Sequence, residues 1–213
     1  MIKNILFDLG GVVVTLDHQE AVRRFTQLGL KQAAVELDPY TQGGIFGELE
    51  SGGIDAVGFM DALRRKCGRK VSYKECLDAW LGYRKEVPAR NLEALGKLRG
   101  EGYRLILVSN TNPFMMAWAE SGDFDGKGNP ISRYFDSLYL SYKMGLMKPD
   151  PSFFSKVLVH EGIAPSETLF VDDGPRNVAA ASQMGIHTFC PANGEDWTAA
   201  VDKILEEEKE IML

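Results

Sequence analysis

Short apolar runs, each followed by small or polar residues, recur along the chain. They cover residues 5–7, 104–108, 135–140, 168–171 and 186–190. Runs of this length bounded by turn residues are typical of buried strands. Helical spacing of apolar residues separates the later runs, so strands and helices alternate. This order predicts an α/β fold, a doubly wound parallel sheet with helices on both faces.

The segment between the first two runs has a helical pattern with few strand signals. Asp17 and Ser72 each have Glu three positions later, which is a capping box at the start of a helix. Residues 54–63 carry apolar residues at helical spacing. We therefore predict an insert of three or four helices after the first strand. The predicted domains are a core of residues 1–16 and 88–213 and a helical cap of residues 17–87.

Composition narrows the class of protein. The chain has 213 residues, 45% of them hydrophobic and 25% charged, as in an ordinary soluble protein. Its net charge of -6 argues against a nucleic-acid partner. No apolar run is long enough to cross a membrane, and no leader pattern begins the chain, so we expect a cytoplasmic protein. Nothing in the sequence indicates an oligomeric state.

The number and spacing of the three cysteines argue against disulfide bonds and against a zinc site. Their number is odd and none forms a C-x-x-C pair, so a disulfide framework or a zinc site is not expected. Cys190 ends a predicted strand, and we interpret it as a small core residue.

The most informative stretch is the first strand and its end. Asp8 follows the apolar run, and Gly10 and Gly11 come directly afterwards. A carboxylate at the carboxyl end of a parallel strand lies where ligands bind in α/β sheets. Glycines there let the backbone approach a bound group. Asp8 therefore suits a nucleophile, although it could also simply cap a turn.

Polar residues follow three further strands or loops. Ser109 and Asn110 come after the second core strand, Lys148 is fixed on a loop before a proline, and Asp172 and Asp173 follow the fourth strand. Adjacent acids repel and need a compensating cation, for which a hard divalent ion is suited. At one sheet edge, this set would supply what Mg²⁺-assisted phosphoryl transfer to an aspartate needs.

These motifs give the chain a clear resemblance. It resembles the haloacid dehalogenase superfamily of phosphohydrolases, whose four motifs occur here in order over essentially the whole length. The residues of the first three motifs are similar to those of bacterial sugar phosphatases that act on glucose 1-phosphate. The four motifs are Asp8-Leu9-Gly10-Gly11-Val12, Ser109-Asn110, Lys148-Pro149, and Val171-Asp172-Asp173 with Asn177.

The resemblance implies an activity and a role for each motif. The protein would hydrolyse a small phosphorylated metabolite, such as a hexose 1-phosphate, with Mg²⁺ as cofactor. Asp8 would attack phosphorus and form an aspartyl-phosphate, and Lys148 would offset charge in the transition state. The phosphate would be held by Ser109, Asn110, Lys148 and the Gly11 N–H, and the metal by Asp8, the Gly10 carbonyl, Asp172 and Asp173, with Asp172 acting through water or steadying Lys148.

The chain departs from the superfamily at Gly10. Most phosphatases of this kind have a second Asp there, which protonates the leaving group and later activates water. A cap residue or a water molecule could take this role, or the protein could be a weak or inactive relative. We favour a third explanation, a leaving group that needs little protonation, such as an anomeric hydroxyl. Sugar 1-phosphates would then be hydrolysed faster than 6-phosphates.

Other activities remain open at this point. Haloacid dehalogenases also lack the second Asp, but they need no metal, so the pair Asp172-Asp173 argues against one. A phosphomutase would normally require the missing acid, and a non-catalytic binding protein would not need to retain Asp8 and Lys148.

The cap is expected to set the choice of substrate. Phe46, Glu50, Trp80 and Tyr83 could line the site or form the core of the cap, and we favour the core for Trp80. Trp118, in the helix after the second core strand, is interpreted as a packing residue.

Overall fold

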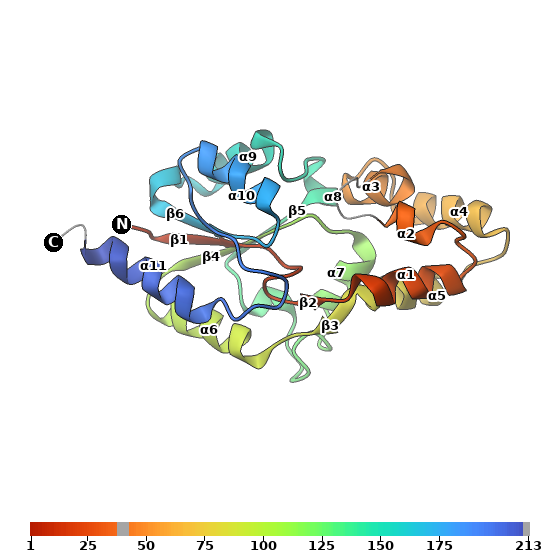
Figure 1. The fold of residues 1–213 in the computed structure, drawn as a ribbon, viewed down its shortest axis with the longest axis horizontal. Coiled ribbons are helices and arrows are strands. Elements are labelled where there is room, and N and C mark those ends of the chain that lie inside the picture. Colours follow the sequence, from red (N-terminus) through yellow and green to blue (C-terminus); the bar gives the residue numbers. More distant parts are fainter. Residues whose placement is uncertain (38–42, 211–213) are drawn as a thin grey trace.

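A five-stranded parallel sheet forms the centre of the computed structural model, which describes residues 1–37 and 43–210 (Figure 1). Residues 38–42, inside the predicted cap, and residues 211–213 lie outside this description. The strand order is β5-β4-β1-β6-β7. The strands are β1 (Asn4–Phe7), β4 (Arg104–Ser109), β5 (Ser137–Leu140), β6 (Thr168–Val171) and β7 (His187–Phe189).

Helices cover both faces of this sheet. Figure 1 shows α6 (Ala89–Gly100) and α11 (Thr198–Glu210) on one face, and α9 (Pro151–Glu161) and α10 (Pro175–Gln183) on the other. The central strands are apolar apart from their end residues because both of their faces are buried. In β1, for example, Phe7 packs into the core beneath α6 and α11, whereas Leu6 packs into the core beneath α9 and α10. The predicted doubly wound parallel sheet is confirmed.

The segment after the first strand is helical, as expected, and lies beside the sheet at the right of Figure 1. Asp17 accepts a hydrogen bond from the Glu20 N–H at 2.9 Å, and Ser72 forms a complete capping box. The described part of the segment contains five α-helices rather than three or four. They are α1 (His18–Gln27), α2 (Ala33–Glu36), α3 (Gly44–Glu50), α4 (Ala56–Cys67) and α5 (Tyr73–Trp80).

These helices share an aromatic core. Phe25, Phe46, Phe59 and Trp80 contact one another with ring centroids between 5.1 and 5.7 Å apart. Trp80 lies at the centre of the cluster and is 2% exposed. Its predicted place in the core is therefore correct. Aromatic rings packed in this way hold the helices as one body.

A short two-stranded ribbon links these helices to the sheet. β2 (Thr15–Leu16) pairs antiparallel with β3 (Arg84–Glu86) at the two crossing points of the chain. The sequence did not indicate it because two or three residues are too few to show alternation. The remaining short elements are α7 (Pro113–Ala119), α8 (Ser141–Met144) and the 3₁₀ turns Leu81–Tyr83, Ile131–Arg133 and Pro165–Glu167. Within the described ranges, no helix has the length and apolar character needed to cross a membrane.

Candidate active site

Three neighbouring strands deliver the predicted site residues to one edge of the sheet. Asp8 directly follows β1, and Asp172 and Asp173 directly follow β6, which pairs with β1. Ser109 is the last residue of β4, which pairs with β1 on its other side. The strands are parallel and in register, so these side chains meet at the carboxyl edge.

Lys148 lies at the centre of this group and is fully buried. Its Nζ donates to Asp172 Oδ2 at 2.6 Å and lies 3.0 Å from Asp8 Oδ1. It also donates to the carbonyl of Val108 at 2.8 Å. The side chain of Asn110 holds the lysine backbone from both sides, with bonds of 2.8 Å to its carbonyl and 2.9 Å from its N–H. Asn110 therefore positions Lys148, whatever contact it makes with phosphate.

The three acids form a compact cluster. Asp8, Asp172 and Asp173 each place a carboxylate oxygen within 4.8 Å of the others. Asp172 is already satisfied, because it also accepts bonds from the Gly174 N–H at 2.7 Å and from Asn177 Nδ2 at 3.0 Å. Asp172 thus steadies Lys148, while Asp8 and Asp173 are better placed to receive a cation.

The charges of the cluster do not balance. Burial raises the pKa of Asp8 well above its usual range, Lys148 opposes this, and Asp172 and Asp173 add to it. Burial and Asp172 raise the pKa of Asp173 to about 6, again against Lys148. Burial would lower the pKa of Lys148, but Asp172 and Asp8 outweigh it and hold that pKa above its ordinary value. Three carboxylates facing one ammonium fit a divalent cation with oxygen ligands.

Gly11 has a steric role in this cluster. Its φ of +80° favours glycine, and a Cβ added there would lie 1.9 Å from Asp173 Oδ2. Its N–H donates to the Val14 carbonyl at 2.8 Å. In this structure the Gly11 N–H closes the loop on itself, and its contact with phosphate stays a prediction.

Two residues that the sequence analysis missed hold the same loop. Asn91 Nδ2 and Trp197 Nε1 both donate to the Val12 carbonyl at 2.9 Å. They come from α6 and from the turn before α11, so no local signal in the sequence links them to the site.

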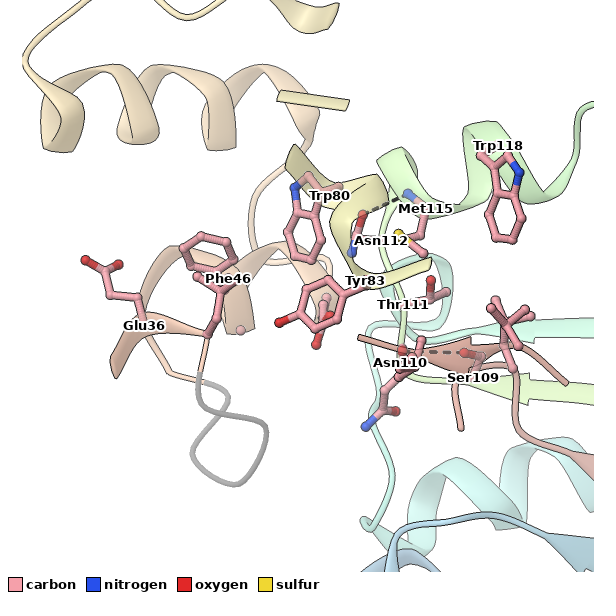
Figure 2. A pocket seen from close by; sticks show the side chains of 17 residues that line it. Glu36, Phe46, Trp80, Tyr83, Ser109, Asn110, Thr111, Asn112, Met115 and Trp118 are labelled. Atoms are coloured by element: carbon pink, nitrogen blue, oxygen red, sulfur yellow. Dashed lines mark hydrogen bonds between the residues drawn. The ribbon is translucent and has the colours of Figure 1, made fainter. Parts of the chain in front are cut away.

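A cavity of about 170 Å³ opens between the sheet edge and the helices of the cap. Figure 2 shows the rings of Phe46, Trp80 and Tyr83 on one side and Ser109 and Asn110 on the other. The volume is below the roughly 300–1,000 Å³ typical of drug-sized ligands, which favours a small substrate. The other lining residues used below are Leu9, Gly10, Leu16, Glu36, Glu50, Asn112 and Trp118.

The residues of the helical segment that could line the site or form its core are found in the wall of this cavity. Phe46, Glu50, Trp80 and Tyr83 all line it, so Trp80 belongs both to the aromatic core and to the wall. Trp118 is buried, as expected of a packing residue, yet it also reaches the cavity. Among the described residues, the buried indole N–H groups of Trp80 and Trp118 have no hydrogen-bond partner. Because these nitrogen atoms are buried from solvent, the two indoles offer the cavity an apolar surface.

Glu50 is the titratable group of this wall with a pKa near neutrality. Burial raises its pKa to about 7, against a hydrogen bond from the Asn112 side chain that lowers it. Burial, followed by the charge of Glu50, raises the pKa of Tyr83. Cys190 is exposed rather than in the core, because β7 ends at Phe189.

Comparison with known proteins agrees with this geometry. A family model described as haloacid dehalogenase-like hydrolase matches residues 2–185. D-ribitol-5-phosphate phosphatase of Bacteroides thetaiotaomicron is 46% identical over 96% of this chain and 99% of its own.

Solved structures show the same relationship. A predicted HAD-like family hydrolase from Porphyromonas gingivalis has a TM-score of 0.92 and 41% identity, covering 96% of this chain and 98% of its own. A HAD family enzyme from Bacteroides thetaiotaomicron, in complex with magnesium and inorganic phosphate, has a TM-score of 0.86 and 36% identity, covering 94% and 99%. An L-2-haloacid dehalogenase from Xanthobacter autotrophicus, 18% identical with a TM-score of 0.61, shares the fold.

The family match spans most of the chain, and the 46% identical relative is covered almost end to end. The sequence resemblance and the expectation of a hydrolase are therefore confirmed. The chain belongs to the haloacid dehalogenase-like hydrolases.

Proposed function

We propose that the protein is a Mg²⁺-dependent phosphatase that hydrolyses a small sugar or polyol phosphate through an aspartyl-phosphate. One observation carries the proposal: a fully buried lysine lies between Asp8 and Asp172, with Asp173 in the same 4.8 Å cluster. A nucleophile, a fixed cation and free metal-binding oxygens are the parts that phosphoryl transfer to a carboxylate needs.

Each residue has a distinct task in this proposal. Asp8 attacks phosphorus, and Lys148 stays charged beside it and offsets negative charge on the phosphoryl oxygens. The Ser109 hydroxyl, which makes a long contact of 3.4 Å to the Asn110 carbonyl, is available to donate to phosphate. Asp8, Asp173 and the Gly10 carbonyl would hold Mg²⁺, with Asp172 in support. The ion would supply Lewis-acid stabilisation of the transferred group.

The substrate is proposed from the cavity and the relatives. Residues 17–87 act as the cap that selects it, because the aromatic wall comes from this segment. A pentitol 5-phosphate is the first candidate, since the 46% identical relative is named for D-ribitol 5-phosphate. A hexose 1-phosphate, which the missing acid at Gly10 favours, is the second.

Phosphate release from a panel of metabolites tests the proposal. Pentitol 5-phosphates, hexose 1-phosphates and hexose 6-phosphates are compared with Mg²⁺ and with chelator, for the wild type and Asp8→Asn. Asp55→Asn is the matched control, because it makes the same change at the N-cap of α4. We expect Mg²⁺-dependent release that Asp8→Asn abolishes and Asp55→Asn keeps. No release from any compound would contradict the proposal, and a haloacid dehalogenase assay would follow.

A further inference from the structure

The cavity lacks an acid on the side of the nucleophile. Gly10 offers no side chain there, and a Cβ added to it would lie 2.9 Å from Cδ1 of Leu16, which occupies that space. When the phosphate ester of a primary alcohol is cleaved, the leaving group is a strongly basic alkoxide. Its departure therefore calls for a proton donor. For a polyol phosphate, the donor must come from another wall of the cavity.

Glu50 is the acid that faces this cavity from the cap. It is the last residue of α3, and it lines the same space as Gly10, Ser109 and Asn110. The cavity has a second acidic residue, Glu36, but its carboxylate is paired with Lys66 at 2.9 Å.

The loop that follows β4 fixes Glu50 in place. The side chain of Asn112 forms a hydrogen bond with the Glu50 carboxylate. Its own Oδ1 accepts the N–H groups of Phe114 and Met115 at 3.1 Å, which leaves the amide NH₂ as the donor to Glu50. Glu50 is thus oriented from the loop that begins with Ser109.

The backbone of Glu50 is anchored from the core as well. Ser141 Oγ donates to the Glu50 carbonyl at 2.6 Å and accepts the N–H of Thr111 at 3.0 Å. The turn after α3 presses against α8, because a Cβ added to Gly52 would lie 2.4 Å from the Tyr142 carbonyl. This end of α3 is where the cap meets the core.

We propose that Glu50 is the general acid and base of the reaction, in place of the side chain that Gly10 lacks. The assignment rests on the proposed phosphatase function. In the first step an Asp8 oxygen bonds to phosphorus, the P–O bond to the alcohol breaks, and the leaving oxygen takes the Glu50 proton. In the second step the Glu50 carboxylate takes a proton from water, the water oxygen attacks phosphorus, and Asp8 leaves as carboxylate. Inorganic phosphate is released and Glu50 is protonated again.

The protonation state of Glu50 agrees with this role. Its pKa of about 7 leaves both forms populated near neutral pH, which is what a group that gives and takes a proton requires. Within residues 1–37 and 43–210, the titratable groups around it include Tyr83 and Glu36 in the wall, with the His18 ring packed on Tyr83 at 5.9 Å. Tyr83 stays neutral in this range because burial and Glu50 raise its pKa.

The test compares leaving groups that do and do not need a proton. Wild type, Glu50→Gln and Glu36→Gln are assayed on a pentitol 5-phosphate and on p-nitrophenyl phosphate, whose phenolate leaves unassisted. We expect Glu50→Gln to lower kcat/KM for the alkyl ester by about 10²–10³-fold and to change that for the aryl ester little. Without its base, the variant should also release a burst of nitrophenolate and then turn over slowly. For the alkyl ester, kcat/KM of the wild type should fall above pH 7, and this fall should be absent in Glu50→Gln.

Each alternative outcome is distinct. If Glu50→Gln lowers kcat/KM equally on both esters, with the fold intact by circular dichroism, Glu50 only supports the site. That result would overturn the assignment. An unchanged Glu50→Gln, or a loss of the same size in Glu36→Gln, would also overturn it. A wild type that hydrolyses neither ester would overturn the proposed function, and the assignment with it.

Discussion

The raised pKa of Glu50 predicts how the stability of the protein depends on pH. The side chain is half-buried at the cavity wall, and its pKa is about 7 instead of 4.5. Between these two values the folded state binds more protons than the unfolded state, so the free energy of unfolding falls as pH rises. Glu50→Gln cannot ionise and escapes this loss. The substitution should therefore stabilise the protein at pH 8 relative to wild type, while it abolishes general acid catalysis.

The size of the effect follows from the two pKa values. One pKa unit is worth about 1.4 kcal/mol, so the full difference between 4.5 and about 7 sets an upper limit of about 3.5 kcal/mol. Because the side chain keeps contact with the cavity, we expect the variant to gain between about 1 and 3 kcal/mol over wild type on going from pH 4.5 to pH 8.

Urea unfolding at several pH values, with chelator present, measures this gain directly. The raised pKa values of Asp8 and Asp173 are common to both proteins, so they cancel in the difference. Glu36→Gln, which removes the acid paired with Lys66 at 2.9 Å, is the control and should not gain stability over wild type as pH rises. A difference between Glu50→Gln and wild type that stays constant with pH would refute the reasoning.

Three further substitutions test the rest of the site. Lys148→Met leaves two buried carboxylates without their cation and should cost about 3–5 kcal/mol in urea unfolding, as well as all activity; a loss below 1 kcal/mol would contradict the buried pair. Gly11→Ala places a Cβ 1.9 Å from Asp173 Oδ2 and should weaken Mg²⁺ binding by calorimetry at least about tenfold. Gly126→Ala, at a similar φ of +67° in open space, is its control and should bind Mg²⁺ normally. Trp118→Phe replaces a ring of the cavity wall whose N–H is buried, so it should change kcat/KM for a polyol phosphate and for p-nitrophenyl phosphate by less than about threefold; a selective loss on the polyol phosphate would show that the indole N–H binds the polyol.

The sequence predicted the features that depend on neighbouring residues. Apolar runs and turn residues located the sheet. Asp8 and Asp173 follow their strands directly and Lys148 lies on a loop before a helix, so the three could be expected at one edge. The helix caps at Asp17 and Ser72 depend on residues three positions apart and were equally accessible.

The features that the sequence did not predict depend on distant contacts. The orientation of Glu50 requires Asn112 and Ser141, which lie about 60 and 90 positions away in the chain and meet it only in the fold. The Gly11 N–H turned out to bond within its own loop, a detail set by the φ of a single residue. Cys190 was placed in the core because strand ends are uncertain by a residue or two.

The ribbon of β2 and β3 marks where the inserted segment leaves and re-enters the core. The segment between β2 and β3 carries both the aromatic wall and Glu50, so a recombination at the ribbon would exchange the two together. Such a transplant would carry its own proton donor together with its own wall. A change of substrate and a change of proton donor would then occur together. A general acid on the core loop after β1 would instead let the two change separately.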